Sequence, residues 1–341
     1  MKKVVRYKYQ RAKIVKTKSD LIDYLAAFND VKLVKQVEKS FSKILKLLSQ
    51  RALRRVGGTL VPERFERLVS ARRQRKHICN AVASSPNDLA KTINIPDTCS
   101  KSNRCMSGLC PVCERQFRLS LVRFVTRNKL RNLSWYMVTI IVKDWNVAPG
   151  ELEAFVDYRD GSAVPKILKA LSAAGTNTPV LAFGSVETVY KLISNKPHAK
   201  PFHIHLLVSG IAQTAIGEAI KGTGILCHEA EKPLDVRHVG KSVSSFLRAA
   251  TYVCKQPLQQ RRKTSALAPR YGANEFPYIR HIDELAANYG DIVTGDRWLS
   301  IGINYADAKF HLDDRIKLRV ENKVKRIIRK AKARRVKLRK Q

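Results

Sequence analysis

Acidic residues are scarce in this sequence. Its 341 residues include 28 Asp and Glu against 65 Lys and Arg, which gives a formal net charge of +37. Such an excess of positive charge is typical of proteins that bind nucleic acids. A purely architectural protein can carry the same charge, but 44% hydrophobic residues over this length are enough to bury more than one core. We therefore expect a folded, two-part protein with a nucleic-acid partner.

Long hydrophobic runs are also missing. No apolar stretch approaches the roughly 20 residues that span a bilayer, and residues 1–18 are basic without the apolar segment of a secretory signal. We therefore expect a cytoplasmic protein with no membrane partner. The phosphate-binding pattern G-x-x-x-x-G-K-[ST] is absent as well, which argues against a helicase activity in this chain.

The seven cysteines are too few and too clustered for a disulfide scaffold. Four of them follow the pattern C-x5-C-x4-C-x2-C, namely Cys99, Cys105, Cys110 and Cys113. The Cys-Pro-Val-Cys half of this pattern is a tight turn that presents two thiolates to one ion. Four thiolates suit a closed tetrahedral zinc site with a structural role. Either Cys79 or His77 could replace Cys99 as a zinc ligand.

Charge and periodicity divide the chain into four parts, at residues 1–76, 77–131, 132–260 and 261–341. The first is a basic DNA-binding region, whose apolar residues between 21 and 48 recur at helical spacing and predict two amphipathic helices. The second holds a linker at about 77–98, the cysteine pattern and a helix at 115–131. The third is the expected catalytic domain, and the fourth is a C-terminal region with a basic tail.

The basic tail spans residues 315–341 and contains 14 basic residues and one acid. Its apolar residues keep a partial helical spacing, so we predict a tail that grips DNA and becomes helical on binding. Arg326, Arg329 and Lys330 are its expected phosphate contacts. The alternative is a solvated charged tail without a partner, which the single sign of the charge disfavours.

Three segments rich in β-branched and aromatic residues predict strands, at 135–142, 180–191 and 201–209. Helical spacing predicts one helix near 163–173 and another near 242–255. The order strand, helix, strand, strand, helix predicts an α+β fold with one central antiparallel sheet.

The last of these strands carries two histidines one residue apart, His203 and His205. Successive side chains of a strand point to opposite faces, so the two imidazoles share a face. They predict either a metal site or two hydrogen-bonded histidines in a buried strand. Glu187, in a neighbouring strand pattern, completes a ligand set that leaves positions open for phosphate and water and suits Mn²⁺ or Mg²⁺. The lower-ranked alternatives, each in a turn or outside the strand pair, are His198, Asp144 and His238.

The helix predicted near 242–255 places Arg248, Tyr252 and Lys255 on one face. Neighbouring positive charge favours the tyrosinate, which is the better nucleophile toward a phosphodiester, and Lys255 can orient the scissile phosphate. A Tyr and a Lys at this spacing are also ordinary surface residues. Combined with a metal-binding histidine pair, however, they point to cleavage of single-stranded DNA.

The order of these motifs between residues 99 and 256 resembles that of the rolling-circle replication initiators (Rep proteins) of small plasmids, in the HUH endonuclease superfamily. The shared elements are the cysteine pattern, the apolar strand at 136–142, the His-hydrophobic-His strand and the Tyr-x-x-Lys helix. The resemblance implies a ferredoxin-like HUH nuclease domain with Tyr252 on a packed helix. It further implies a 5′-phosphotyrosyl intermediate, a free 3′-hydroxyl and later strand joining. The implied partners are single-stranded or hairpin origin DNA, a host helicase and a host DNA polymerase.

One position departs from this family pattern. Some initiators of this type carry a glutamate one helical turn before the tyrosine, where it activates water or a second strand at termination, and this chain has Arg248 there. Termination then needs another group, such as Glu187 or a second tyrosine. Two other functions stay open: a transposase or mobilisation relaxase with the same chemistry, and a non-catalytic, zinc-containing DNA-binding protein. The cysteine pattern ahead of the first strand favours replication over the former.

Overall fold

The computed structural model describes most of the chain after residue 52. The described residues are 53–62, 65–83, 99, 104–105, 110–146, 162–175, 179–187, 189–193, 196–198, 201–240, 242–254, 259–263, 274–275, 298–306 and 309–340. The chain divides into two units, Met1–Leu53 with Pro62–Arg64, and Arg54–Val61 with Phe65–Gln341. Nearly all described residues belong to the second unit, and the helices predicted between 21 and 48 lie outside the described residues.

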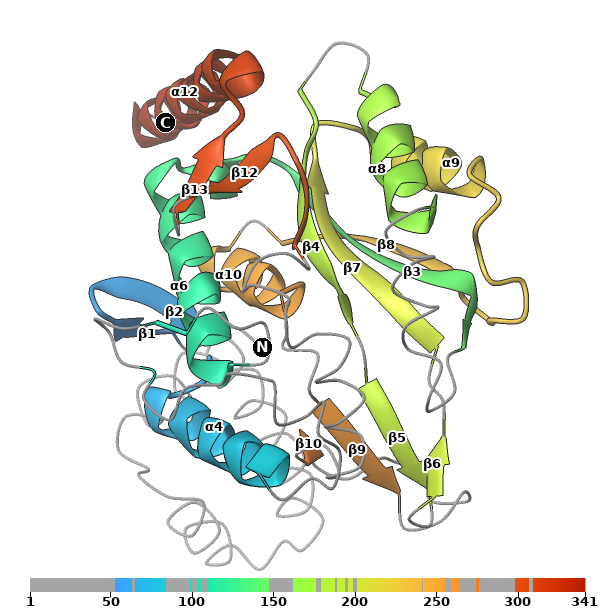
Figure 1. Cartoon of the computed structure of the whole chain (residues 1–341). Coiled ribbons are helices and arrows are strands. Elements are labelled where there is room, and N and C mark those ends of the chain that lie inside the picture. Colours follow the sequence, from blue (N-terminus) through green and yellow to red (C-terminus); the bar gives the residue numbers. More distant parts are fainter. Residues whose placement is uncertain are drawn as a thin grey trace, which may run out of the picture. The chain divides into compact units, whose positions relative to one another are not determined.

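A five-stranded antiparallel sheet forms the centre of the second unit (Figure 1). Its strands are β3 (Trp135–Asn146), β4 (Leu181–Glu187), β7 (Pro201–Ser209), β8 (Leu234–His238) and β11 (Trp298–Ile301). Their spatial order is β11-β4-β7-β3-β8, so β7 lies in the middle, and each neighbouring pair is antiparallel. The mixed fold with one antiparallel sheet that the sequence predicts is confirmed.

One face of this sheet packs against two helices, α8 (Val164–Ala173) and α9 (Gln213–Lys221), which also contact each other (Figure 1). Ile204, Leu206 and Val208 of β7 are fully buried on this face among apolar residues of both helices. Because side chains alternate along a strand, the histidines of β7 point to the opposite face. In chain order α8 stands between β3 and β4, and α9 stands between β7 and β8.

The opposite face of the sheet packs against α10 (Val243–Tyr252) and α6 (Pro111–Arg127), which contact each other. Aromatic rings fill much of this interface. Trp135 of β3 is buried against Phe183 of β4 and Phe246 of α10. Trp298 of β11 stacks on Phe183 and meets Phe117 of α6 edge to face. Strand β11 therefore closes the sheet edge and also links it to α6.

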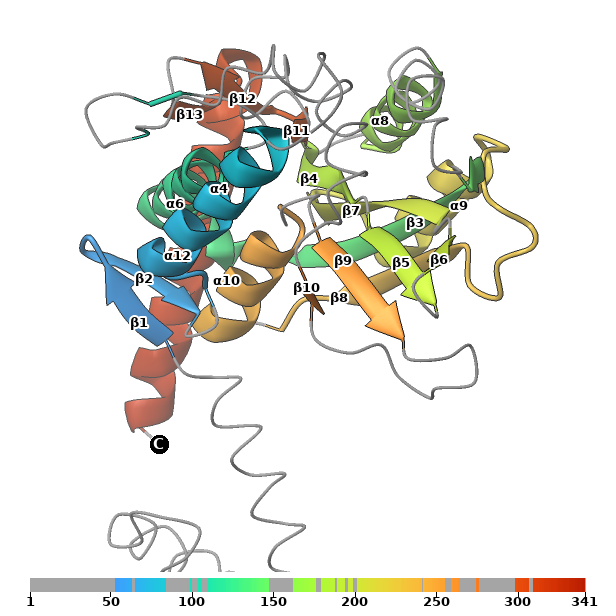
Figure 2. The ribbon, with the colours of Figure 1, turned by 60° about the horizontal axis from the view of Figure 1, so that its bottom comes forward.

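The remaining elements are peripheral to the sheet (Figures 1 and 2). Two pairs of short strands are β1 (Leu53–Val56) with β2 (Thr59–Pro62) and β12 (Ile303–Ala306) with β13 (Lys309–Leu312). A second sheet has the order β10-β9-β5-β6, formed by β5 (Val189–Ile193), β6 (Lys196–His198), β9 (Gln259–Lys263) and β10 (Asn274–Glu275). The other helical segments are α4 (Leu68–Ala83), the 3-10 turn η1 (Leu130–Asn132) and α12 (Asp314–Lys340). Among the described helices none is long and apolar enough to cross a membrane.

Two helix boundaries differ from those that the sequence predicts. Helix α4 continues to Ala83, so the expected linker at 77–98 begins no earlier than residue 84. The apolar Ala71 and Ile78, seven residues apart, are both buried and keep this helix packed across the expected boundary. Helix α10 ends at Tyr252, so Lys255 does not belong to it and lies outside the described residues.

The basic tail is helical, as the spacing of its apolar residues predicts. Helix α12 begins at Asp314 and runs without a break to Lys340. Val320 and Val324 are buried, one turn apart, so the first half of the helix packs on the rest of the unit.

Candidate functional site

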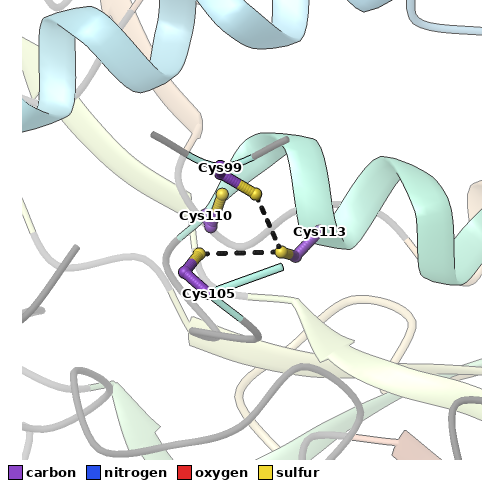
Figure 3. A group of neighbouring side chains, drawn as sticks. All are labelled: Cys99, Cys105, Cys110 and Cys113. Carbon is purple, nitrogen blue, oxygen red and sulfur yellow. Dashed lines mark hydrogen bonds between the residues drawn. The ribbon is translucent and has the colours of Figure 1, made fainter. Parts of the chain in front are cut away.

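The four predicted zinc ligands converge at the start of α6 (Figure 3). Their sulfur atoms all lie within 4.8 Å of one another, and the Sγ atom of Cys113 is 3.5 Å from that of Cys99 and 3.6 Å from that of Cys105. Cys110 occupies the N-cap position of α6 and Pro111 the first position of the helix, so Cys113 lies in its first turn. A zinc–sulfur bond of about 2.3 Å places the sulfurs of a tetrahedral site about 3.8 Å apart, so the cluster fits zinc closely.

The thiol chemistry of this cluster also fits a bound cation. None of the four cysteines is part of a disulfide, and Cys99, Cys110 and Cys113 are buried. The hydrogen-bonding contact with Cys105, followed by that with Cys110 and by burial, raises the pKa of the Cys113 thiol. Four neighbouring thiolates therefore need a positive ion to offset their mutual repulsion, and zinc is the ion that prefers four of them. Among the described residues the cluster contains Cys99, and neither Cys79 nor His77 belongs to it.

His203 and His205 lie side by side on the central strand, on the face turned away from α8 and α9. Their ring centroids are 4.5 Å apart and the ring planes are nearly perpendicular, at 88°. His205 is buried, whereas His203 is partly exposed. The Cα of Glu187 on β4 is paired with that of His203. Residues directly opposite across an antiparallel pair share a face, so Glu187 occupies the position of β4 opposite His203.

The ring of Tyr252 contacts that of His205. The two centroids are 5.0 Å apart with an interplanar angle of 66°. The hydroxyl of Ser185, which is paired with His205 in the sheet, donates a hydrogen bond of 2.7 Å to the carbonyl of Val253. This bond fixes the end of α10 on β4, directly after the tyrosine. A Cβ at Gly184 would clash with the main-chain carbonyl of His205, so only glycine permits this close strand approach.

The hydroxyl of Thr139 orients the ring of His205 from the other side. Its Oγ1 atom lies 3.0 Å from Nδ1 of His205, and the two residues are paired across β3 and β7. This contact engages Nδ1, so Nε2 is the nitrogen that would serve as the ligand atom for a cation. A metal-binding histidine commonly has such a partner on its other ring nitrogen. Sequence inspection does not find Thr139, because strand register is set by pairing between distant segments.

Substitution of Thr139 by valine will weaken divalent cation binding, because the ring of His205 loses the partner that holds its orientation. We expect the Kd for Mn²⁺ to rise by about 10–100-fold. The measurement is a Mn²⁺ titration in which electron paramagnetic resonance monitors binding. Thr223→Val is the matched control, because that hydroxyl bonds only the carbonyl of Ile220 in a turn after α9. An unchanged Kd in Thr139→Val would remove this threonine from the site.

The other residues that the sequence predicts to contact DNA or metal lie on α10, α12 and β8, or outside the described side chains. Arg248 lies one turn before Tyr252 on α10, and its buried Nε atom has no hydrogen-bond partner among the described residues. The expected phosphate contacts Arg326, Arg329 and Lys330 are exposed on α12. Among the lower-ranked ligands His238 is paired with Tyr136, on the sheet face opposite to His205. The side chains that lie outside the described ones are those of Glu187, Lys255, His198 and Asp144.

Comparison of this chain with protein-family models, with curated proteins and with solved structures found no match.

Proposed function

We propose that this protein is a metal-dependent DNA-nicking and strand-transferring endonuclease of the HUH type, acting as a plasmid rolling-circle replication initiator. The observation that carries the proposal is the contact between a tyrosine and a histidine pair on the central strand. His203 and His205 are 4.5 Å apart, and Tyr252 is 5.0 Å from His205, measured between ring centroids. A nucleophile beside metal-binding side chains is the arrangement that phosphodiester cleavage needs.

The strand order supports this proposal. Without β11, the sheet order is β8-β3-β7-β4, and the chain runs β3, α8, β4, β7, α9, β8. This is the β-α-β-β-α-β order of a ferredoxin-like fold, with its fourth, first, third and second strands side by side. The HUH resemblance implies this fold, with the histidines on a central strand. We therefore propose a ferredoxin-like nuclease domain with β11 as an additional edge strand.

The ligand chemistry also supports it. His203, His205 and Glu187 would hold one Mg²⁺ or Mn²⁺, because Glu187 is paired with His203 in the sheet and the hydroxyl of Thr139 holds the ring of His205 through Nδ1. When bound, such an ion polarises a phosphate oxygen and stabilises negative charge during phosphoryl transfer.

The chain's own groups account for the covalent step. The Tyr252 oxygen loses its proton and attacks the phosphorus of the scissile phosphodiester. As the tyrosyl–phosphorus bond forms, the bond from phosphorus to the 3′ oxygen breaks, and that oxygen takes up a proton. The products are a 5′-phosphotyrosyl protein and a free 3′-hydroxyl. Arg248, one turn before the tyrosine, would hold the phosphate by charge. Attack by a 3′-hydroxyl on the phosphotyrosine reverses the step and rejoins the strands.

Charge supports a DNA substrate for this site. The chain carries a net charge of +37, and α12 exposes Arg326, Arg329 and Lys330. A single-stranded or hairpin segment is the proposed substrate, because the tyrosine must reach a backbone phosphate that is not held in a regular duplex. A host helicase and a host DNA polymerase would then act on the nicked origin. Transposition or mobilisation would use the same chemistry on a different DNA.

The proposed function is tested by incubating the purified protein with labelled single-stranded and hairpin DNA from its own replicon, with Mn²⁺ or with a chelator. We expect an adduct that survives denaturing electrophoresis only in the presence of Mn²⁺. Mass spectrometry of the digested adduct should find the nucleotide on the peptide that contains Tyr252. Absence of an adduct with every metal and strand would favour a non-catalytic, zinc-containing DNA-binding protein.

A further inference from the structure

Helix α4 presents a stripe of positive charge that the proposed nuclease chemistry does not use. Arg72, Arg73 and Lys76 are exposed and lie on one side of the helix, with Val69 before them. The buried residues of α4 lie on the other side, at Ala71 and Ile78. The helix contains no acidic residue along its whole length. The charges on its exposed face are therefore all positive.

The cysteine cluster and α6 hold this helix in place (Figure 2). Ala71 packs directly on Cys99, Cys110 and Cys113 in one buried cluster. The position of the stripe therefore depends on the packing of α4 against the cysteine cluster.

Arginines of α6 fix the chain immediately before α4. Arg118 forms a 2.9 Å ion pair with Glu66, and Arg115 donates to the main-chain carbonyl of the same residue. Both side chains of the ion pair are largely buried, at 10% and 13% exposure. These contacts hold the start of α4 against α6, so the stripe has a fixed position relative to α6.

The three cations of the stripe have no partner of opposite charge within the described part of the chain. Neither a hydrogen bond nor an ion pair joins Arg72, Arg73 or Lys76 to another described residue. Arg72 and Lys76 are about 6 Å apart along the helix axis, at 1.5 Å per residue. Unpaired cations at this spacing on a rigid helix suit a polyanion with closely spaced phosphates.

Duplex DNA fits this stripe better than other polyanions. A helix is about 10–12 Å wide, and the major groove of about 12 Å admits it. Binding of single strands relies on aromatic side chains that stack on bases, and α4 contains no Phe, Tyr or Trp. An interfacial membrane helix buries a broad apolar face in lipid, whereas the apolar face of α4 is covered by the cysteine cluster.

We propose that α4 is a duplex-binding helix, whose cationic stripe contacts DNA phosphates and whose position depends on the cysteine cluster. The stripe is separate from the tyrosine and histidine residues, so the inference does not require the cleavage chemistry. In a nicking enzyme, the stripe would bind the duplex next to the single-stranded substrate.

The test measures binding of the full-length protein to a labelled duplex of mixed sequence over a series of salt concentrations, without added Mg²⁺ or Mn²⁺. The variant is the triple substitution Arg72→Ala, Arg73→Ala and Lys76→Ala. We expect duplex affinity to fall by at least about tenfold, and the slope of log affinity against log salt to decrease by about 2.7, at 0.9 per lost phosphate contact. Binding to a single strand should change much less.

The matched control removes three exposed lysines from α8 and α9, on the other face of the sheet, by the substitutions Lys166→Ala, Lys169→Ala and Lys221→Ala. Both variants should keep the zinc content and Tm of the wild-type protein. The proposal is overturned if the α4 variant binds the duplex as the wild type does, or if the control or the single strand shows an equal loss. The adduct assay tests the nuclease proposal, and the duplex titration tests the role of α4. A failure of one proposal therefore does not decide the other.

Discussion

A Tyr252→Phe variant will form no covalent adduct with single-stranded DNA, although it will bind that DNA as tightly as the wild-type protein. The substitution removes the oxygen that forms the bond to phosphorus and keeps the ring that contacts His205. We expect adduct formation to fall by at least about 1,000-fold, because removal of a catalytic nucleophile costs more than this in well-characterised enzymes. The measurement is the yield of adduct after denaturing electrophoresis in Mn²⁺.

Tyr136→Phe is the matched control for this substitution. Tyr136 is partly buried on the opposite face of the sheet, where its ring meets that of His238. Loss of its hydroxyl should leave the adduct yield unchanged. A Tyr252→Phe protein that still forms the adduct would show that a different tyrosine, or a different nucleophile, carries the reaction.

A Cys113→Ser variant will lose its zinc and much of its stability. The sulfur of Cys113 is 3.5 Å from that of Cys99 and 3.6 Å from that of Cys105, and Cys113 lies in the first turn of α6, which packs on α4 and α10. Structural zinc binds small domains with an apparent free energy of about 10–16 kcal/mol. We expect a loss of at least about 3 kcal/mol, corresponding to a decrease in Tm of roughly 10 °C. Metal analysis and thermal unfolding measure the two effects.

Cys227→Ser provides the control for zinc loss. Cys227 is a partly exposed thiol outside the cluster, and the partner of its sulfur is the carboxylate of Glu229 at 3.8 Å. This variant should retain one zinc per chain and the wild-type Tm. If the wild-type protein contains no zinc, or if Cys113→Ser retains it, the four thiols serve another purpose.

Local patterns in the sequence predict much of the sheet and of the cysteine cluster. The β-branched segments from 135, 180 and 201 all contain strands, because their residue types suit a pleated, buried surface. Alternation alone puts His203 and His205 on one face, since this property needs no partner strand. The cysteine spacing likewise predicts the convergence of the four thiols, which the structure confirms.

Features that depend on distant segments could not be predicted in this way. The strand register brings Thr139 and Ser185 beside His205, and no local pattern encodes that pairing. Strands β8 and β11 lie at the sheet edges and are only five and four residues long, so their alternation is too brief to stand out. The end of α10 before Lys255 was also missed, because Val253 and Cys254 continue the apolar pattern while forming a turn.

The late position of β11 has a consequence for synthesis of the protein. Ser185 of β4 is paired with Trp298 of β11, far along the chain, so the outer edge of β4 has no partner until that strand leaves the ribosome. At a synthesis rate of about 5–20 residues per second, the nascent chain carries an open strand edge for roughly 6–23 seconds. Open edges are sites of aggregation. The charge density of the chain would help to keep nascent molecules apart during this interval, and the central sheet becomes complete only after β11 has been synthesised.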